Sequence, residues 1–163
     1  MRAPSYWAAL VTLVVLGSYP YLTASFTEVT PPTRPVAVFG DHEIAILDAT
    51  LAEPAGSEQA QLTIVFQVLR PLAIDYNVFF QALTGTADTE QVVAQVDLQP
   101  LGDAKPATVW RPGEILTASY ELDLANAPQS IPLHYYFGFY DWRDGRRMVV
   151  DNGLDDKLVF RGR

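Results

Sequence analysis

Hydrophobic and polar residues alternate along most of the chain after its first thirty positions. The clearest case is the segment 116–124, whose apolar positions are Leu116, Ala118, Tyr120, Leu122 and Leu124. The segment 61–68 repeats the pattern with Leu62, Ile64, Phe66 and Val68. Because successive side chains of a β-strand point to opposite faces, a period of two predicts strands that bury one face.

Further short runs of the same kind recur, separated by turn signals such as Pro112-Gly113. The remaining strand candidates are Val36–Phe39, His42–Leu51, Tyr76–Leu83, Val92–Asp97, His134–Tyr140, Arg147–Val150 and Lys157–Phe160. No stretch after residue 30 has a sustained helical period. The pattern predicts an all-β domain over residues 36–163, an antiparallel immunoglobulin-like β-sandwich.

The N-terminal segment has a different pattern, because no charged residue occurs from Ala3 to Thr27. A helix needs about 20 apolar residues to cross a bilayer, so we predict one N-terminal transmembrane helix within residues 1–27. Arg2 precedes the run and Glu28 follows it, which favours a cytoplasmic N-terminus and a periplasmic C-terminal domain on the inner membrane. The residues expected to anchor it are Trp7, Leu10, Leu13, Val14, Leu16 and Tyr19.

A cleaved signal peptide is the alternative for this segment. The apolar stretch Tyr6–Leu16 has the length of a signal-peptide core, but Thr23–Ser25 is a poor cleavage motif. Both interpretations export the rest of the chain. Residues 28–35 contain three prolines, and they are expected to form an extended spacer ahead of the domain.

Composition narrows the possible functions. The formal net charge of −8 argues against nucleic-acid binding, which needs a basic face. The absence of cysteine excludes disulfides, thiolate metal sites and a cysteine nucleophile.

Part of the chain resembles a known module. The matching pieces, in chain order, are "YNVFFQAL", "VVAQVD", "PATVWRPGEI", "SYEL" and "FGFYDWRDGRR", within about residues 76–147. They resemble an extracytoplasmic β-sandwich module of bacterial membrane proteins, often appended to glycosyltransferases of the dolichyl-phosphate-mannose type. The resemblance implies a fold and a location outside the cytoplasm, and it implies no catalytic role. In "WRPGE", Pro112 and Gly113 suit the centre of a type II turn, and Trp110 is placed to close the end of the core.

The stretch "GFYDWRDGRR", residues 138–147, is the densest group of polar and aromatic side chains. Asp141 and Asp144 could act as the two carboxylates of a glycosidase. Asp144-Gly145 is also a strong turn signal between two strand candidates, so we predict a β-hairpin with a solvent-facing tip rather than a catalytic pair.

Other chemistry is weakly supported. His42 and His134 lack ligand spacing, and the segment Asp151–Asp156 lacks the spacing of an EF-hand calcium loop. There is no G-x-S-x-G sequence. We therefore expect no enzyme activity, no cofactor and no metal.

The segment "HYYFGFYDW" has aromatic residues on both faces of a predicted strand. One row is Tyr135, Phe137 and Phe139, and the other is Tyr136, Tyr140 and Trp142, with a gap at Gly138. Since a sandwich strand buries one face, one row is expected to be exposed for binding unless a loop covers it. The predicted partner-binding residues are Tyr136, Tyr140, Trp142, Arg143, Arg146 and Arg147. As an alternative, these arginines pair with Asp141, Asp151 or Asp155.

These features together predict a non-catalytic accessory subunit of a larger membrane complex. Its partners would be the protein subunits of that complex and the lipid bilayer. A respiratory or photosynthetic assembly is one candidate host. The alternative is a cell-surface carbohydrate-binding module that uses Tyr136, Tyr140 and Trp142 as its aromatic platform.

Overall fold

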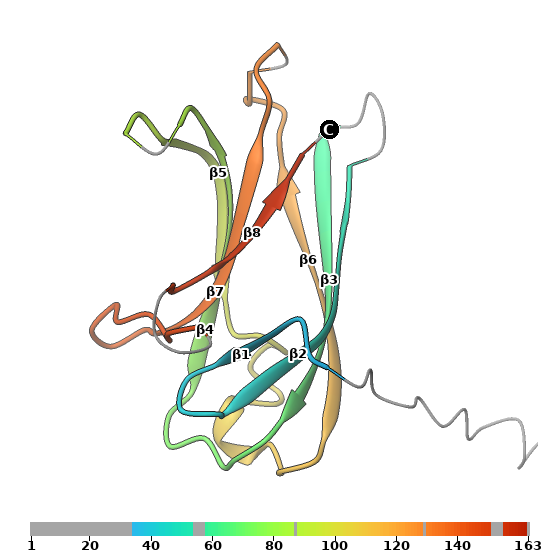
Figure 1. Ribbon diagram of the computed structural model, residues 1–163, viewed down its shortest axis with the longest axis vertical. Coiled ribbons are helices and arrows are strands. Elements are labelled where there is room, and N and C mark those ends of the chain that lie inside the picture. The colour runs from blue at the N-terminus through green and yellow to red at the C-terminus, as the bar shows by residue number, and fades with distance from the viewer. Residues whose placement is uncertain (1–33, 54–57, 87, 129, 151–154, 163) are drawn as a thin grey trace, which may run out of the picture. The chain divides into compact units, whose positions relative to one another are not determined.

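The computed structural model describes residues 34–53, 58–86, 88–128, 130–150 and 155–162. Their strands form two four-stranded antiparallel sheets (Figure 1). Sheet A has the order β1-β2-β3-β6 and consists of β1 (Ala37–Phe39), β2 (Ile44–Ala52), β3 (Gln59–Val68) and β6 (Ile115–Asp123). Sheet B has the order β5-β4-β7-β8 and consists of β4 (Tyr76–Thr84), β5 (Gln91–Leu98), β7 (His134–Asp141) and β8 (Leu158–Arg161). The all-β prediction and the sandwich are confirmed.

The alternation of apolar and polar residues in the sequence corresponds to an alternation of buried and exposed side chains in the strands. Along β6 every second side chain is buried, starting at Leu116, and the residues between them are exposed. On the outer face of sheet A, Thr63 and Ser119 share a hydrogen bond of 3.0 Å between hydroxyl oxygens. The exposed face of this sheet is thus polar, and its buried face supplies half of the core.

The core lies between the two sheets and is rich in aromatic rings. Phe39 of sheet A packs edge-on against Phe139 of sheet B, with ring centroids 5.1 Å apart. Tyr120 packs against Phe137 at 5.5 Å across the same interface. Edge-to-face aromatic pairs stabilise by about 0.5–1.5 kcal/mol beyond the area that they bury. These contacts make the two sheets one hydrophobic core.

The sequence "WRPGE" forms the predicted turn. The Glu114 N–H donates to the Arg111 carbonyl oxygen at 3.0 Å, and Gly113 has a φ of 86°, as the third position of a type II turn requires. Trp110, next to the short 3-10 turn Ala107–Val109, is buried 5.2 Å from the ring of Phe66. Trp110 closes one end of the core, as predicted.

The predicted strand at Arg147–Val150 is wrong as a regular strand. This segment makes isolated bridges instead, from Arg147 to Tyr140 of sheet B and from Val150 to Phe39 of sheet A. The Met148 N–H donates to the Phe139 carbonyl oxygen at 2.9 Å, and the Gly40 N–H donates to the Val149 carbonyl oxygen at 2.8 Å. Because its hydrogen bonds are divided between two sheets, the segment extends neither sheet and joins both.

The predicted membrane anchor (Trp7, Leu10, Leu13, Val14, Leu16 and Tyr19) and nearly all of the spacer lie outside the described residues. Within the described ranges, no helix has the length and apolar character that crossing a membrane requires. The transmembrane helix therefore stays a prediction.

Candidate functional site

The stretch "GFYDWRDGRR" forms the predicted β-hairpin. Tyr140 and Arg147 form its last β-bridge. The Asp141 N–H donates to the Arg146 carbonyl oxygen at 2.8 Å, and the Gly145 N–H donates to the Asp141 carbonyl oxygen at 2.8 Å. Gly145 has a φ of 75°, in the left-handed region that glycine adopts without strain. Residues 140–147 are called the Asp141 hairpin from here on.

Asp141 fixes the base of this hairpin. Asp141 is only 3% exposed. The Arg143 guanidinium donates to both of its carboxylate oxygens, at 2.8 Å from Nε and 2.7 Å from Nη2. The Arg143 backbone N–H adds a third hydrogen bond of 3.0 Å. The Arg143 side chain lowers the pKa of Asp141 to about 2. A carboxyl group with a pKa this low has no proton to donate at neutral pH, so Asp141 is unsuited to be the general acid of a glycosidase.

The loop of the Asp141 hairpin, from residue 142 to residue 146, carries the most exposed of the predicted binding residues. Trp142 is 59% exposed, and the Arg146 side chain is 77% exposed. The Arg146 guanidinium lies 3.7 Å from the Asp144 carboxylate, and exposed pairs of this kind contribute only about 0–1 kcal/mol. A large indole and a weakly held guanidinium are therefore exposed within one turn, four positions apart in sequence.

Arg147 is held differently from Arg146. Its guanidinium carbon lies 4.2 Å from the ring centroid of Phe79, and its Nη1 atom lies 3.3 Å from a carboxylate oxygen of Asp156. The sequence suggested Asp141, Asp151 and Asp155 as alternative partners for the arginines; Asp141 does pair with Arg143, and Asp156 was not foreseen. Asp155 instead pairs with Lys157 at 3.2 Å, and Asp151 lies outside the described residues.

The two aromatic rows of β7 have different fates. The first row, Tyr135, Phe137 and Phe139, is fully buried in the core. In the second row, Tyr136 and Tyr140 are half-buried and Trp142 is exposed. The gap at Gly138 is filled by the ring of Phe79, since a Cβ at Gly138 would lie 2.6 Å from Phe79 Cζ. The outer face of β7 is thus covered in its middle and open at the hairpin.

Tyr136 belongs to a separate polar cluster. Its hydroxyl donates to Glu90, and the Lys157 ammonium lies 5.0 Å from its ring centroid. Burial and then the Glu90 hydrogen bond raise the pKa of Tyr136 to about 12. His134 Nε2 lies 3.2 Å from the same carboxylate. Because Lys157 covers one face of the ring, Tyr136 is a poor member of a flat sugar-stacking platform.

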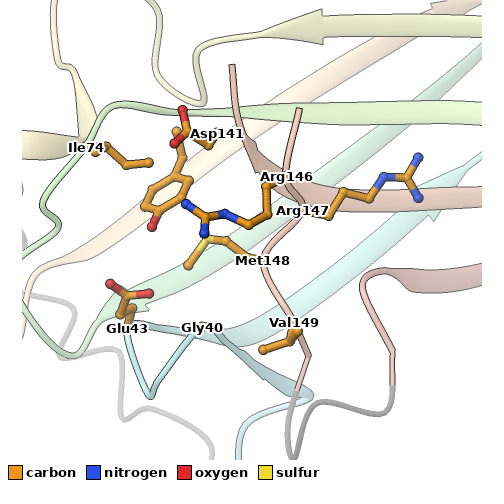
Figure 2. A pocket seen from close by; sticks show the side chains of 9 residues that line it. Gly40, Glu43, Ile74, Asp141, Arg146, Arg147, Met148 and Val149 are labelled. Carbon is orange, nitrogen blue, oxygen red and sulfur yellow. The ribbon is translucent and has the colours of Figure 1, made fainter. Parts of the chain in front are cut away.

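A small cavity of about 190 Å³ adjoins the Asp141 hairpin. Figure 2 shows the Arg146 side chain reaching across it, whereas the Arg147 side chain points away. Glu43, from the turn between β1 and β2, lines the opposite side. Burial raises the pKa of Glu43, and burial also raises the pKa of Tyr76, which lines the same cavity. The cavity gives the exposed hairpin a recess beside it.

Metal chemistry finds little support in the part of the chain that the structure describes, where no three His, Cys, Asp or Glu side chains could hold an ion. His42 lies in the turn between β1 and β2 of sheet A, and His134 begins β7 of sheet B. Four of the six residues of the segment Asp151–Asp156, namely 151–154, lie outside the described residues. No protein-family model matches the chain, and a search of curated proteins finds no match.

Proposed function

We propose that this protein is a non-catalytic accessory subunit that binds a protein partner through the Asp141 hairpin of its β-sandwich. The observation that carries the proposal is that Trp142 and Arg146 are both exposed on one hydrogen-bonded turn. Tryptophan and arginine are the residue types most enriched among the few side chains that dominate protein–protein binding energies.

The rigidity of the hairpin supports this proposal. Asp141 and Arg143 lock the turn from within, and residues 147–150 connect it to both sheets through bridges at Arg147 and Val150. A binding loop that is ordered before association loses less conformational entropy when the complex forms. The fold therefore presents Trp142 in a defined position rather than on a loose loop.

The chemistry of the acidic residues supports a non-catalytic role. Asp141 is occupied by a guanidinium on both carboxylate oxygens, and Asp144 accepts a hydrogen bond from the Arg146 backbone N–H at 2.9 Å. Asp144 thus serves the turn itself, as aspartate often does through a side-chain bond to a backbone N–H two residues on. Both carboxylates therefore stabilise the turn, and no catalytic role is needed to explain them.

The proposal includes an immunoglobulin-like topology, a single N-terminal membrane helix and an extracytoplasmic sandwich. The strand order supports the topology, since the paired strands β3 and β6 of sheet A face a sheet in which β4 and β8 flank β7. After the hairpin of β2 and β3 in sheet A, the chain crosses to β4 in sheet B. Immunoglobulin-like domains have the same kind of crossover between their two sheets. The uncharged stretch Ala3–Thr27 supports the anchor.

Purification of the full chain from its native membranes in mild detergent tests the proposal. We expect a stoichiometric protein companion to copurify, and mass spectrometry of the purified complex identifies it. Migration as a free monomer without any companion, under conditions that preserve other membrane complexes, would refute the accessory-subunit function.

A further inference from the structure

A second cavity lies on the outer face of sheet B, apart from the cavity beside Arg146. It is an open groove of about 440 Å³, which falls within the roughly 300–1,000 Å³ of small-molecule sites. The groove is lined by residues of β4, β5, β7 and the Asp141 hairpin, namely Phe79, Gln81, Gln95, Asp97, Tyr140, Gly145 and Arg147.

Three polar side chains on one side of this groove are linked in a chain of hydrogen bonds. The Gln81 amide of β4 donates to the Gln95 side-chain oxygen of β5 at 2.9 Å, and the Gln95 amide in turn donates to the Asp97 carboxylate. Each amide group is oriented by its neighbour. One N–H of each glutamine, the Gln81 side-chain oxygen and the remaining Asp97 oxygen are left for a ligand, which gives the groove both donors and acceptors.

The other side of the groove combines an aromatic ring with a cation. The Tyr140 hydroxyl accepts a hydrogen bond of 3.4 Å from the Asn77 amide, so its own O–H remains a donor. The Arg147 guanidinium carbon lies 4.2 Å from the ring centroid of Phe79, and its Nη1 atom lies 3.3 Å from an Asp156 carboxylate oxygen. The remaining N–H groups of Arg147 belong to a guanidinium whose position is fixed before any ligand arrives.

We propose that this groove binds a neutral oligosaccharide. A sugar presents hydroxyls that donate and accept at once, which matches the mixed array of Gln81, Gln95, Asp97 and Arg147, and its C–H face packs on an aromatic ring such as Tyr140. One carboxylate and one guanidinium line the groove, so an anionic ligand that is attracted by Arg147 is repelled by Asp97. A purely apolar ligand would leave these polar groups unpaired, which is unfavourable.

Binding of the full-length chain, in detergent micelles, to an array of neutral hexose oligosaccharides tests the proposal, with sulfated and phosphorylated sugars as the charged comparison. We expect a subset of neutral glycans to be retained and the charged set to be lost. Gln95→Ala breaks the chain of hydrogen bonds, so it is expected to weaken binding of the retained glycan by about tenfold or more.

Gln61→Ala is the matched control. Gln61 is also an exposed strand glutamine whose amide donates to a carboxylate, that of Glu121 at 3.2 Å, but on the outer face of sheet A. This variant is expected to bind the glycan as the wild type does, with both variants keeping the wild-type circular dichroism spectrum. Retention of no neutral glycan by the folded protein, or equal loss in both variants, would overturn the proposal.

The groove shares Tyr140, Gly145 and Arg147 with the Asp141 hairpin, but it does not include Trp142, on which the proposed partner docking depends. Trp142 does not line the groove, so Trp142→Ala is expected to leave glycan binding within about twofold of wild type, while Gln95→Ala leaves the protein companion bound. Failure of one function therefore leaves the other measurable. Loss of glycan binding in Trp142→Ala with Gln95→Ala unaffected would place the sugar on the hairpin tip and contradict the groove.

Discussion

Gly138 offers the sharpest test of how the outer face of sheet B is built. A Cβ at this position would lie 2.6 Å from Phe79 Cζ and 2.9 Å from the carbonyl oxygen of Asp156. Neither separation is compatible with van der Waals contact, and one of the two atoms is backbone. Gly138→Ala must therefore push Phe79 out of its place beneath Arg147.

The expected loss follows from the surroundings of Phe79. Its ring is 2% exposed, and adding a methyl group to a packed site of this kind costs about 1–3 kcal/mol. Displacement of Phe79 also removes its contact with the Arg147 guanidinium at 4.2 Å, worth about 0.5–1 kcal/mol. The lower backbone entropy of alanine in the unfolded chain offsets about 0.4–1 kcal/mol. The net destabilisation is about 2 kcal/mol, and the melting temperature should fall by roughly 5–10 °C.

Thermal and urea unfolding of the full chain, followed by circular dichroism, measures this loss. Phe79→Leu provides the second arm, because a smaller side chain makes room for the new methyl group. In the double variant the two losses should be less than additive by about 1 kcal/mol or more, as expected for residues in direct contact. A Gly138→Ala variant as stable as wild type, or strict additivity, would show that Phe79 does not occupy the gap.

Two further predictions concern the end of the core and the hairpin base. Trp110→Ala should cost about 3–5 kcal/mol in urea unfolding, because the indole is 3% exposed and its Nε1–H donates to the Lys105 carbonyl oxygen at 3.0 Å; a loss below about 1 kcal/mol would contradict its place in the core. The folded pKa of Asp141 is about 2, below the ordinary 3.8, so its link to Arg143 stabilises fully above about pH 4 and is lost as the pH falls toward 2. The NMR shift of the Arg143 amide should therefore titrate with a midpoint near 2, and a midpoint near 3.8 would contradict the link.

The strands were predictable because their cause is local. An alternating sequence such as that of β6 buries one face whatever its partner, so the period of two is enough to place it. The turn at Pro112-Gly113 was predictable for the same reason, since its geometry depends on the φ preferences of two residues. The prediction of a strand at Arg147–Val150 was wrong because the hydrogen bonds of this segment go to two different sheets. The local alternation of apolar and polar residues carries no information about such a division.

The candidate sites were predictable only in part. Asp144-Gly145 identified the hairpin, and the aromatic row drew attention to Tyr140, which lines the groove in the structure. The polar wall was missed, because Gln81 and Gln95 become neighbours only through the register of β4 against β5. The sequence did not predict that Phe79 is buried on the outer face of sheet B. Its ring fills the gap at Gly138 and is covered by Arg147, and both residues lie about sixty positions away in sequence.

The proposed partner binding depends on two exposed side chains of the Asp141 hairpin, Trp142 and Arg146. Trp142→Ala combined with Arg146→Ala removes both exposed side chains and leaves the Asp141–Arg143 hydrogen bonds in place. Val109→Ala combined with Arg111→Ala is the matched control, because it removes an exposed apolar residue and an exposed arginine from the loop around Trp110.

Copurification of the protein companion with these two double variants and the wild type, alongside their melting temperatures, tests the account most directly. We predict that the hairpin variant melts within about 2 °C of wild type and binds its companion about thirtyfold more weakly or worse, as expected when two binding-energy hot spots are lost. The control should match wild type in both measurements. A hairpin variant that loses stability but keeps its companion would show that Trp142 and Arg146 serve the fold, and the docking account would be wrong.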